Sequence, residues 1–150
     1  MNITCEEKSG QSVYPEIVQV QQGDTLYFPN VDSCMSITYV LDDDSFIGGH
    51  VGWGENMQPD TNANRILDEM AQISSTTKVI KIIFIGDLPS YSASLANFSS
   101  SQECSVHKID NPDGQADIYF STSDNSLSIN RSGTEIYSSS LANLPDTKTL

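Results

Sequence analysis

Basic residues are scarce in this chain. Its 150 residues include 7 Lys and Arg against 20 Asp and Glu, which gives a formal net charge of -13 at pH 7. A phosphate backbone or an anionic membrane surface would repel a protein with this charge. We therefore expect no nucleic-acid partner, and we attribute the acidity to solubility rather than to a specific role.

Cysteine is also scarce, and long apolar runs are absent. Cys5, Cys34 and Cys104 make an odd count without a basic, apolar leader before them, which argues against a disulfide framework. The longest nearly apolar run, 79–85, is interrupted by Lys81 and is too short to span a bilayer. We expect no membrane insertion and a cytoplasmic location. A secreted or translocated effector without a cleavable signal peptide would have the same features.

Alternation of apolar and polar residues predicts strands along most of the chain. In 35–41, Met35, Ile37, Tyr39 and Leu41 share one face, while Cys34 falls on the other. The other predicted strands are 16–20, 26–28 ending at Pro29, a return strand from Phe46, 79–85, 106–109, 116–120, 127–129 and 134–137. The last four are separated by turn residues, which predicts a meander of short antiparallel strands.

Two helices are predicted between the strands. Asp60-Thr61 resembles an N-cap, and apolar residues then recur at helical spacing at Ala63, Ile66, Leu67, Met70 and Ile73. A weaker pattern over 92–101 directs Leu95 and Phe98 inward. The chain is long enough for one domain, with a polar lead-in at 1–15 and a mobile C-terminal tail at 141–150. We predict an α+β fold with layered, sandwich-like mixed sheets and about two flanking helices.

A thiol and an imidazole lie at the open end of one predicted hairpin. Cys34 precedes the strand 35–41, Asp42-Asp43-Asp44 supplies the turn, and His50 follows Gly48-Gly49 on the return. A hairpin brings such positions within side-chain reach. Cys34 could then be a thiolate nucleophile activated by His50.

The order of these motifs resembles the chemoreceptor glutamine deamidases, the CheD family, which share a catalytic fold with the cytotoxic necrotizing factor toxins. The resemblance rests on Ser33-Cys34, the strand and acidic turn that follow, and Ile47-Gly48-Gly49 before a His. It continues at the turn Asp110-Asn-Pro-Asp-Gly114 and the closing hairpin of 116–120 and 126–130. It implies a protein-glutamine deamidase without a cofactor or metal, acting on an exposed Gln of a partner protein, such as a chemoreceptor.

Roles for the residues around the pair follow from this chemistry. Cys34 would attack the amide, and His50 would protonate the departing ammonia. Backbone N–H groups at Ser33-Cys34 could stabilise the oxyanion, and Gly48, Gly49 and Trp53 would border the substrate cleft. A third group would orient the imidazole: the resemblance favours Thr25, and Asn30 and Asp32 are further candidates.

Other interpretations remain open at this point. A secreted toxin or effector acting on a host signalling protein would show the same motifs. The chain lacks the family's glycine-rich approach to its cysteine, so a non-catalytic binding module with the same fold is a further alternative. Cys104 and His107 have a spacing that could ligate zinc, and the three aspartates at 42–44 could bind calcium, but a strand start and a solvated turn are the simpler interpretations.

Overall fold

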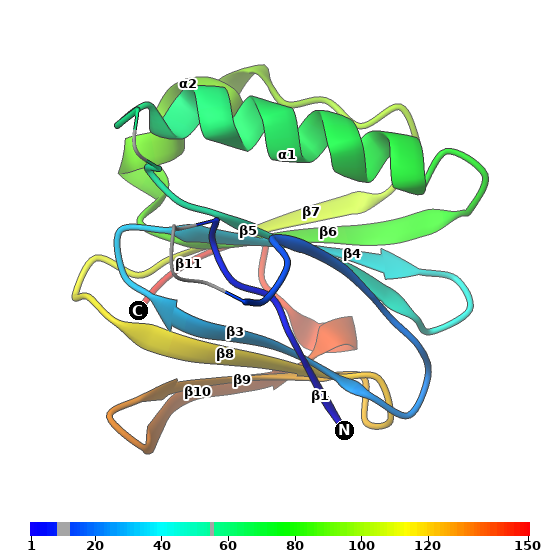
Figure 1. The fold of residues 1–150 in the computed structure, drawn as a ribbon. Helices are drawn as coiled ribbons and strands as arrows, with labels where there is room; N and C mark the ends of the chain where they lie inside the picture. Colours follow the sequence, from blue (N-terminus) through cyan, green and yellow to red (C-terminus); the bar gives the residue numbers. More distant parts are fainter. Residues whose placement is uncertain (9–12, 55) are drawn as a thin grey trace.

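The computed structural model describes residues 1–8, 13–54 and 56–150, which form three layers (Figure 1). Helices α1 (Pro59–Ile73) and α2 (Ser92–Asn97) lie over one face of a six-stranded sheet. A five-stranded sheet covers its other face. The predicted α+β class, with layered mixed sheets and two helices, is confirmed.

The six-stranded sheet is the middle layer and carries the candidate site. Its strand order is β11-β7-β6-β4-β5-β2. The β6/β7 and β7/β11 pairs are parallel, and the other pairs are antiparallel. The strands are β2 (Ile17–Val20), β4 (Met35–Leu41), β5 (Phe46–Val51), β6 (Val79–Gly86), β7 (Ser105–Asp110) and β11 (Thr147–Thr149).

The five-stranded sheet has the order β1-β3-β8-β9-β10. Its strands are β1 (Asn2–Thr4), β3 (Thr25–Val31), β8 (Ala116–Ser121), β9 (Ser126–Arg131) and β10 (Thr134–Ser140). The β1/β3 pair is parallel and the others are antiparallel. In β10, the last strand of this sheet, the register with β9 shifts between Glu135 and Tyr137. Two short 3-10 helices, η1 (Leu88–Tyr91) and η2 (Leu141–Asn143), complete the fold.

Strand β4 divides the interior into two cores. As predicted, Met35, Ile37, Tyr39 and Leu41 face one way, and they pack beneath α1. Cys34 and Val40 lie in the second core, between the two sheets. Both faces of β4 are therefore buried, including the face that carries Cys34.

The structure corrects three of the predicted elements. Residues 106–109 do not join the antiparallel meander, because β7 lies in the other sheet, parallel to β6. Strand β3 continues through Pro29 to Val31. Helix α1 begins at Pro59 after Gln58, with no side-chain cap, and the Asp60 carboxylate instead accepts the backbone N–H of Ser94 at 2.9 Å.

Both ends of the chain pair with strands, where the sequence predicted a polar lead-in at 1–15 and a mobile tail at 141–150; residues 9–12 of the lead-in lie outside the described residues. β1 pairs with β3 from Asn2 onward. Near the other end, Leu141 and Leu144 are buried between the sheets, and β11 pairs with β7. The segment 141–150 therefore packs on the core through Leu141 and Leu144.

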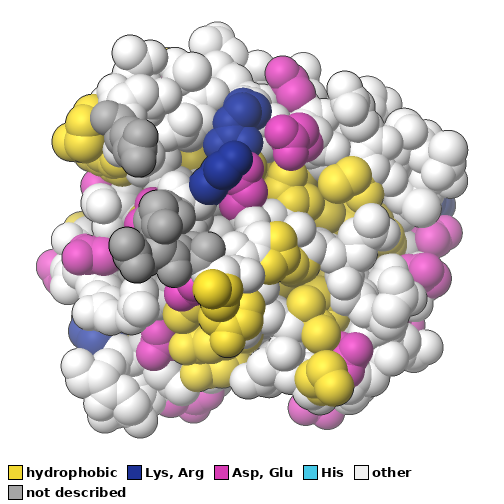
Figure 2. All heavy atoms as spheres, viewed as in Figure 1, with side chains coloured by type: hydrophobic (Ala, Val, Ile, Leu, Met, Phe, Trp, Pro, Cys, Tyr) yellow, Lys and Arg dark blue, Asp and Glu magenta, His cyan; other side chains and the backbone are white. Residues whose placement is uncertain are grey.

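On the face drawn in Figure 2, acidic side chains lie at several separate positions instead of forming one patch. No helix in the described part of the chain is long and apolar enough to cross a membrane.

Candidate active site

The β4–β5 hairpin brings Cys34 and His50 to the same face of the middle sheet. In the register of the two strands, Ser36 lies directly opposite His50, and Cys34 is two residues before Ser36. Such diagonal neighbours on one face are about 7–8 Å apart between Cα atoms, within reach of long side chains. Both are buried from solvent, with exposed fractions of 4% for Cys34 and 2% for His50.

The imidazole of His50 is held by a backbone carbonyl. Its Nδ1 lies 2.9 Å from the carbonyl oxygen of Cys5. Because a carbonyl only accepts, Nδ1 carries the proton and Nε2 of the neutral ring has a free lone pair. Nε2 is buried and has no hydrogen-bond partner among the described residues. Burial lowers the pKa of His50 below its ordinary value, which keeps the ring neutral.

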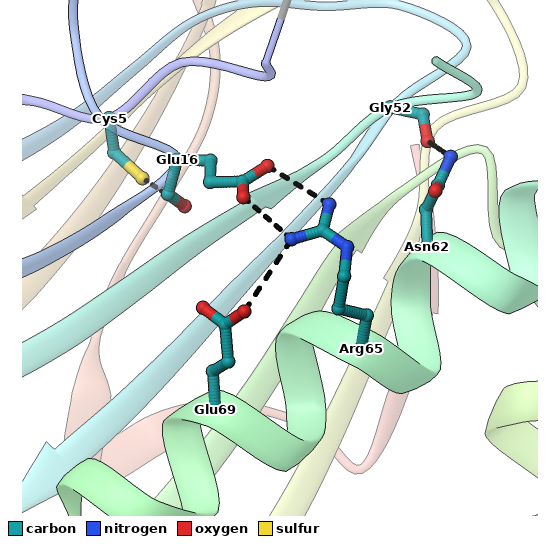
Figure 3. Close-up of polar contacts among 6 residues, drawn as sticks. All are labelled: Cys5, Glu16, Gly52, Asn62, Arg65 and Glu69. Atoms are coloured by element: carbon teal, nitrogen blue, oxygen red, sulfur yellow. Dashed lines mark hydrogen bonds and ion pairs between the residues drawn. The ribbon is translucent and has the colours of Figure 1, made fainter. Parts of the chain in front are cut away.

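Cys5 and His50 are fixed through Glu16, the residue before β2. The Glu16 carbonyl oxygen accepts the His50 backbone N–H at 2.9 Å and the Cys5 thiol at 3.2 Å. Its carboxylate forms a bidentate pair with Arg65 of α1, at 2.6 and 3.2 Å (Figure 3). Arg65 also lies 3.7 Å from Glu69. Helix α1 therefore helps to hold the segment that orients the imidazole.

Cys34 is a protonated thiol at neutral pH in this arrangement. Burial raises its pKa from 9.0 to about 12, and the negative charge of Glu7 and a hydrogen bond with the Glu7 carboxylate add to the rise. The backbone N–H of Asp32 opposes this shift. No hydrogen bond joins Cys34 to His50 Nε2, since that nitrogen has no partner in the described chain. Cys34 and His50 thus share a face of the sheet but are not hydrogen-bonded to each other.

Two aromatic side chains fix the turn before Cys34. The Ser33 carbonyl oxygen accepts a hydrogen bond from Trp53 Nε1 and another from the Tyr91 hydroxyl, each at 3.0 Å. The Tyr91 hydroxyl also lies 3.2 Å from the carbonyl oxygen of Val51. Tyr91 thus bridges the start of β4 and the end of β5. Ser33 is exposed and Trp53 is partly buried, so both lie at the edge of the site.

The loop after His50 is attached to helix α1 through Asn62. Its side-chain Nδ2 donates to the carbonyl oxygens of Gly52 at 2.9 Å and Trp53 at 2.8 Å. Figure 3 shows Asn62 reaching from α1 to Gly52. This anchor fixes the backbone that borders Cys34.

Gly48 and Gly49 do not open a substrate cleft. A Cβ on Gly48 would lie 2.7 Å from Leu26, in the space between the sheets. A Cβ on Gly49 would lie 2.7 Å from both Ile66 and Met70 of α1. The two glycines instead allow the second sheet and the helix to approach β5 closely. The space that we expected for a glutamine side chain is filled by core residues.

The three predicted imidazole orienters do not contact the ring. Thr25 faces away from the inter-sheet core, because strand alternation places it opposite Leu26, which is fully buried there. Asn30 is exposed, donating its N–H to Asp117. Asp32 is also exposed. It bonds neither imidazole nitrogen, because Nδ1 is held by the Cys5 carbonyl and Nε2 has no partner among the described residues. The Cys5 carbonyl takes the place proposed for these side chains.

The possible metal ligands are dispersed. His107 Nδ1 lies 2.9 Å from the Pro145 carbonyl oxygen, and Cys104 packs at the helix-side core, away from the core that contains Cys34. In the residues that the structure describes, no three His, Cys, Asp or Glu side chains gather in a way that could hold a metal ion.

Two surface pockets lie away from the site. One, of about 510 Å³, is lined by α1, Tyr39 and the segment 97–102. The other, of about 260 Å³, lies at the ends of β8 and β9. Neither is lined by Cys34 or His50.

Three residues of the site were missed in the sequence. Cys5 lay in a segment interpreted as a polar lead-in, although Ile3 and Cys5 already alternate with polar residues there. Glu7 and Tyr91 gave no signal, because their roles depend on contacts between segments distant in the chain.

Compared with known protein families and curated proteins, the chain matches no family model and no curated protein.

Proposed function

We propose that the protein is a Cys–His amidohydrolase that converts glutamine side chains of a partner protein to glutamate. The observation that carries the proposal is the state of His50: a carbonyl holds the protonated Nδ1, and the Nε2 lone pair is buried without a partner among the described residues, on the face that bears Cys34. A buried base of this kind is what activation of a neighbouring thiol requires. The resemblance of the Ser33-Cys34 and Gly48-Gly49-His50 motifs to the glutamine deamidases supports the same assignment.

The reaction follows from these two groups. His50 Nε2 takes the proton of the Cys34 thiol, and the sulfur attacks the side-chain carbonyl carbon of the glutamine. The tetrahedral adduct collapses to a thioester as ammonia leaves with the proton from His50. Nε2 then accepts a proton from water, the hydroxide attacks the thioester, and glutamate and the free thiol are released. The Cys5 carbonyl stabilises the imidazolium in each step.

Two substrate classes fit this chemistry. One is a receptor domain inside the same cell, and the other is a signalling protein of a host that receives the protein as a secreted effector. A cytoplasmic location belongs to the first and translocation to the second.

A non-catalytic binding module is the second candidate, because of one specific observation. Cys34 is 4% exposed and its thiol pKa is raised to about 12, neither of which suits a free nucleophile. In this alternative, Cys34 is a small apolar residue of the inter-sheet core.

Mass spectrometry separates the two candidates. Candidate partner proteins are incubated with the purified chain and analysed for a gain of about one dalton at a single glutamine, the mass change of amide hydrolysis. We expect the gain with the unmodified protein and with Cys104→Ser, and its loss with Cys34→Ser. A gain that persists in Cys34→Ser would exclude the proposed nucleophile.

A further inference from the structure

Glu7 covers the thiol of the candidate site. The charge of its carboxylate and a hydrogen bond with it help to raise the pKa of the Cys34 thiol, and its charge acts on the pKa of His50 and of Tyr91 as well. The side chain lies flat against Gly52: a Cβ on Gly52 would overlap the carboxylate and lie 2.7 Å from Glu7 Cδ and 3.0 Å from its Cβ. Glu7 therefore fills the space beside Cys34, between the end of β5 and the turn before β4.

The chemical identity of this side chain is informative. Glutamate is the product that hydrolysis of a glutamine amide releases, and the two side chains differ only at one terminal atom of nearly equal size. Resting on the proposed function, we propose that Glu7 occupies the glutamine position of the site as a built-in product analogue, which a substrate glutamine must displace.

The residues before Glu7 are held independently of its side chain. The backbone N–H of Cys5 donates to Tyr27 at 2.9 Å, and that of Glu6 donates to Pro15 at 3.0 Å. Cys5 is also fully buried. These contacts hold Cys5 and Glu6, so displacement of the Glu7 side chain would leave the Cys5 carbonyl in place on His50. The glutamine side chain that replaces Glu7 would lie against the backbone of Gly52.

The first test measures the cover itself. Glu7→Ala is expected to raise the rate of iodoacetamide labelling of Cys34 at neutral pH about tenfold or more, because a lost carboxylate both exposes the thiol and favours the thiolate. Glu103→Ala removes the same charge at an exposed remote position and should leave the rate unchanged. Equal labelling of Cys34 in Glu7→Ala and the unmodified protein overturns the proposal.

A second measurement does not depend on reactivity. Gly52→Ala should lower the melting temperature when Glu7 is present, because the new methyl group overlaps its carboxylate. In the Glu7→Ala background, the same substitution should have a smaller effect, as a double-mutant cycle records. Equal effects in both backgrounds would show that Glu7 does not lie on Gly52.

Glu7→Gln then tests the chemistry at the same position. It places an amide where the substrate amide is proposed to lie, so Cys34 and His50 should hydrolyse this introduced amide to glutamate. The intact mass of Glu7→Gln should rise by about one dalton with time, and it should stay constant in Glu7→Gln/Cys34→Ser. If Glu7→Ala accelerates labelling and the introduced amide persists, Glu7 is a cover and the deamidase function is wrong. If Glu7→Ala does not accelerate labelling, the cover is wrong whatever happens to the introduced amide.

Discussion

The carbonyl oxygen of Cys5 lies 2.9 Å from Nδ1 of His50, although 45 positions separate the two residues in the chain. A backbone carbonyl does not titrate, and a substitution at Cys5 changes the side chain without removing the carbonyl. The imidazole is therefore oriented by a group whose charge is the same at every pH. A side-chain carboxylate at this position would instead lose its negative charge on protonation.

Burial of His50 should make stability depend on pH in the mildly acidic range. The pKa of the folded imidazole lies below 6.5, so as pH falls past 6.5 the unfolded chain takes up a proton before the folded chain does. The free energy of unfolding should thus decrease on acidification below about pH 6.5. Urea denaturation between pH 5 and 7.5 measures this slope. His50→Gln should lack this part of the slope, and an unchanged slope would contradict a depressed pKa.

Cys34 should make stability depend on pH in the opposite range. Its thiol ionises near pH 9.0 in the unfolded chain and at about 12 in the folded protein. The contribution to stability is complete below pH 9 and is lost as pH rises toward 12, because the unfolded chain releases its proton first. Denaturation at pH 8 to 11 should show a smaller loss for Cys34→Ala than for the unmodified protein. An equal loss in the two proteins would mean that the thiol is solvated.

Gly86→Ala should destabilise the protein and disturb the candidate nucleophile. Gly86 has φ of +153°, and a Cβ there would overlap the Cys34 carbonyl oxygen and lie 2.8 Å from Met35 Cα. Backbone cannot move aside as a side-chain end can, so we expect a loss of about 3 kcal/mol or more. Gly23→Ala is the control, because its φ of +101° carries strain without any atom within 4 Å. It should cost about 1–2 kcal/mol. Chemical denaturation measures the free energy of unfolding of both variants. Equal losses would show that the contact with the Cys34 carbonyl adds nothing to the cost at Gly86.

Asn62→Asp should loosen the loop that follows His50. The substitution replaces a donor that serves the Gly52 and Trp53 carbonyl oxygens with a negatively charged acceptor. We expect a loss of about 1–3 kcal/mol and faster hydrogen exchange in the loop. Asn64→Asp makes the same change at an exposed position of α1 and should stay within about 0.5 kcal/mol of the unmodified protein. Similar losses for both variants would attribute the effect to helix charge instead.

Local patterns predicted the elements that depend on local chemistry. The alternation of 35–41 and the apolar spacing of Ala63, Ile66 and Met70 follow from which faces are buried, and the structure has them as expected. Pairing between distant segments left no such pattern. Residues 106–109 alternate in the same way whether they join the meander or lie parallel to β6, so the sheet to which β7 belongs could not be predicted.

The candidate site divides in the same way. The hairpin that carries Cys34 and His50 is a local structure, and its turn residues and glycines identify it. The group on His50 Nδ1 is a backbone atom of Cys5, and every residue type provides a carbonyl oxygen, so no residue type could reveal it. Gly48 and Gly49 were predicted to border a substrate cleft, and only the positions of Leu26 and Met70 show that they serve close packing.

The register shift in β10 has a consequence for association between copies of this protein. β10 ends its sheet, and such a strand offers unpaired backbone groups to any other extended chain. The register shift between Glu135 and Tyr137 interrupts the regular hydrogen-bond ladder of this edge strand. Four of the seven residues of β10 are Thr or Ser, and Glu135 adds a charge. A second copy would therefore meet an irregular, hydrophilic edge strand instead of a flat, apolar one. This disfavours edge-to-edge association at high protein concentration.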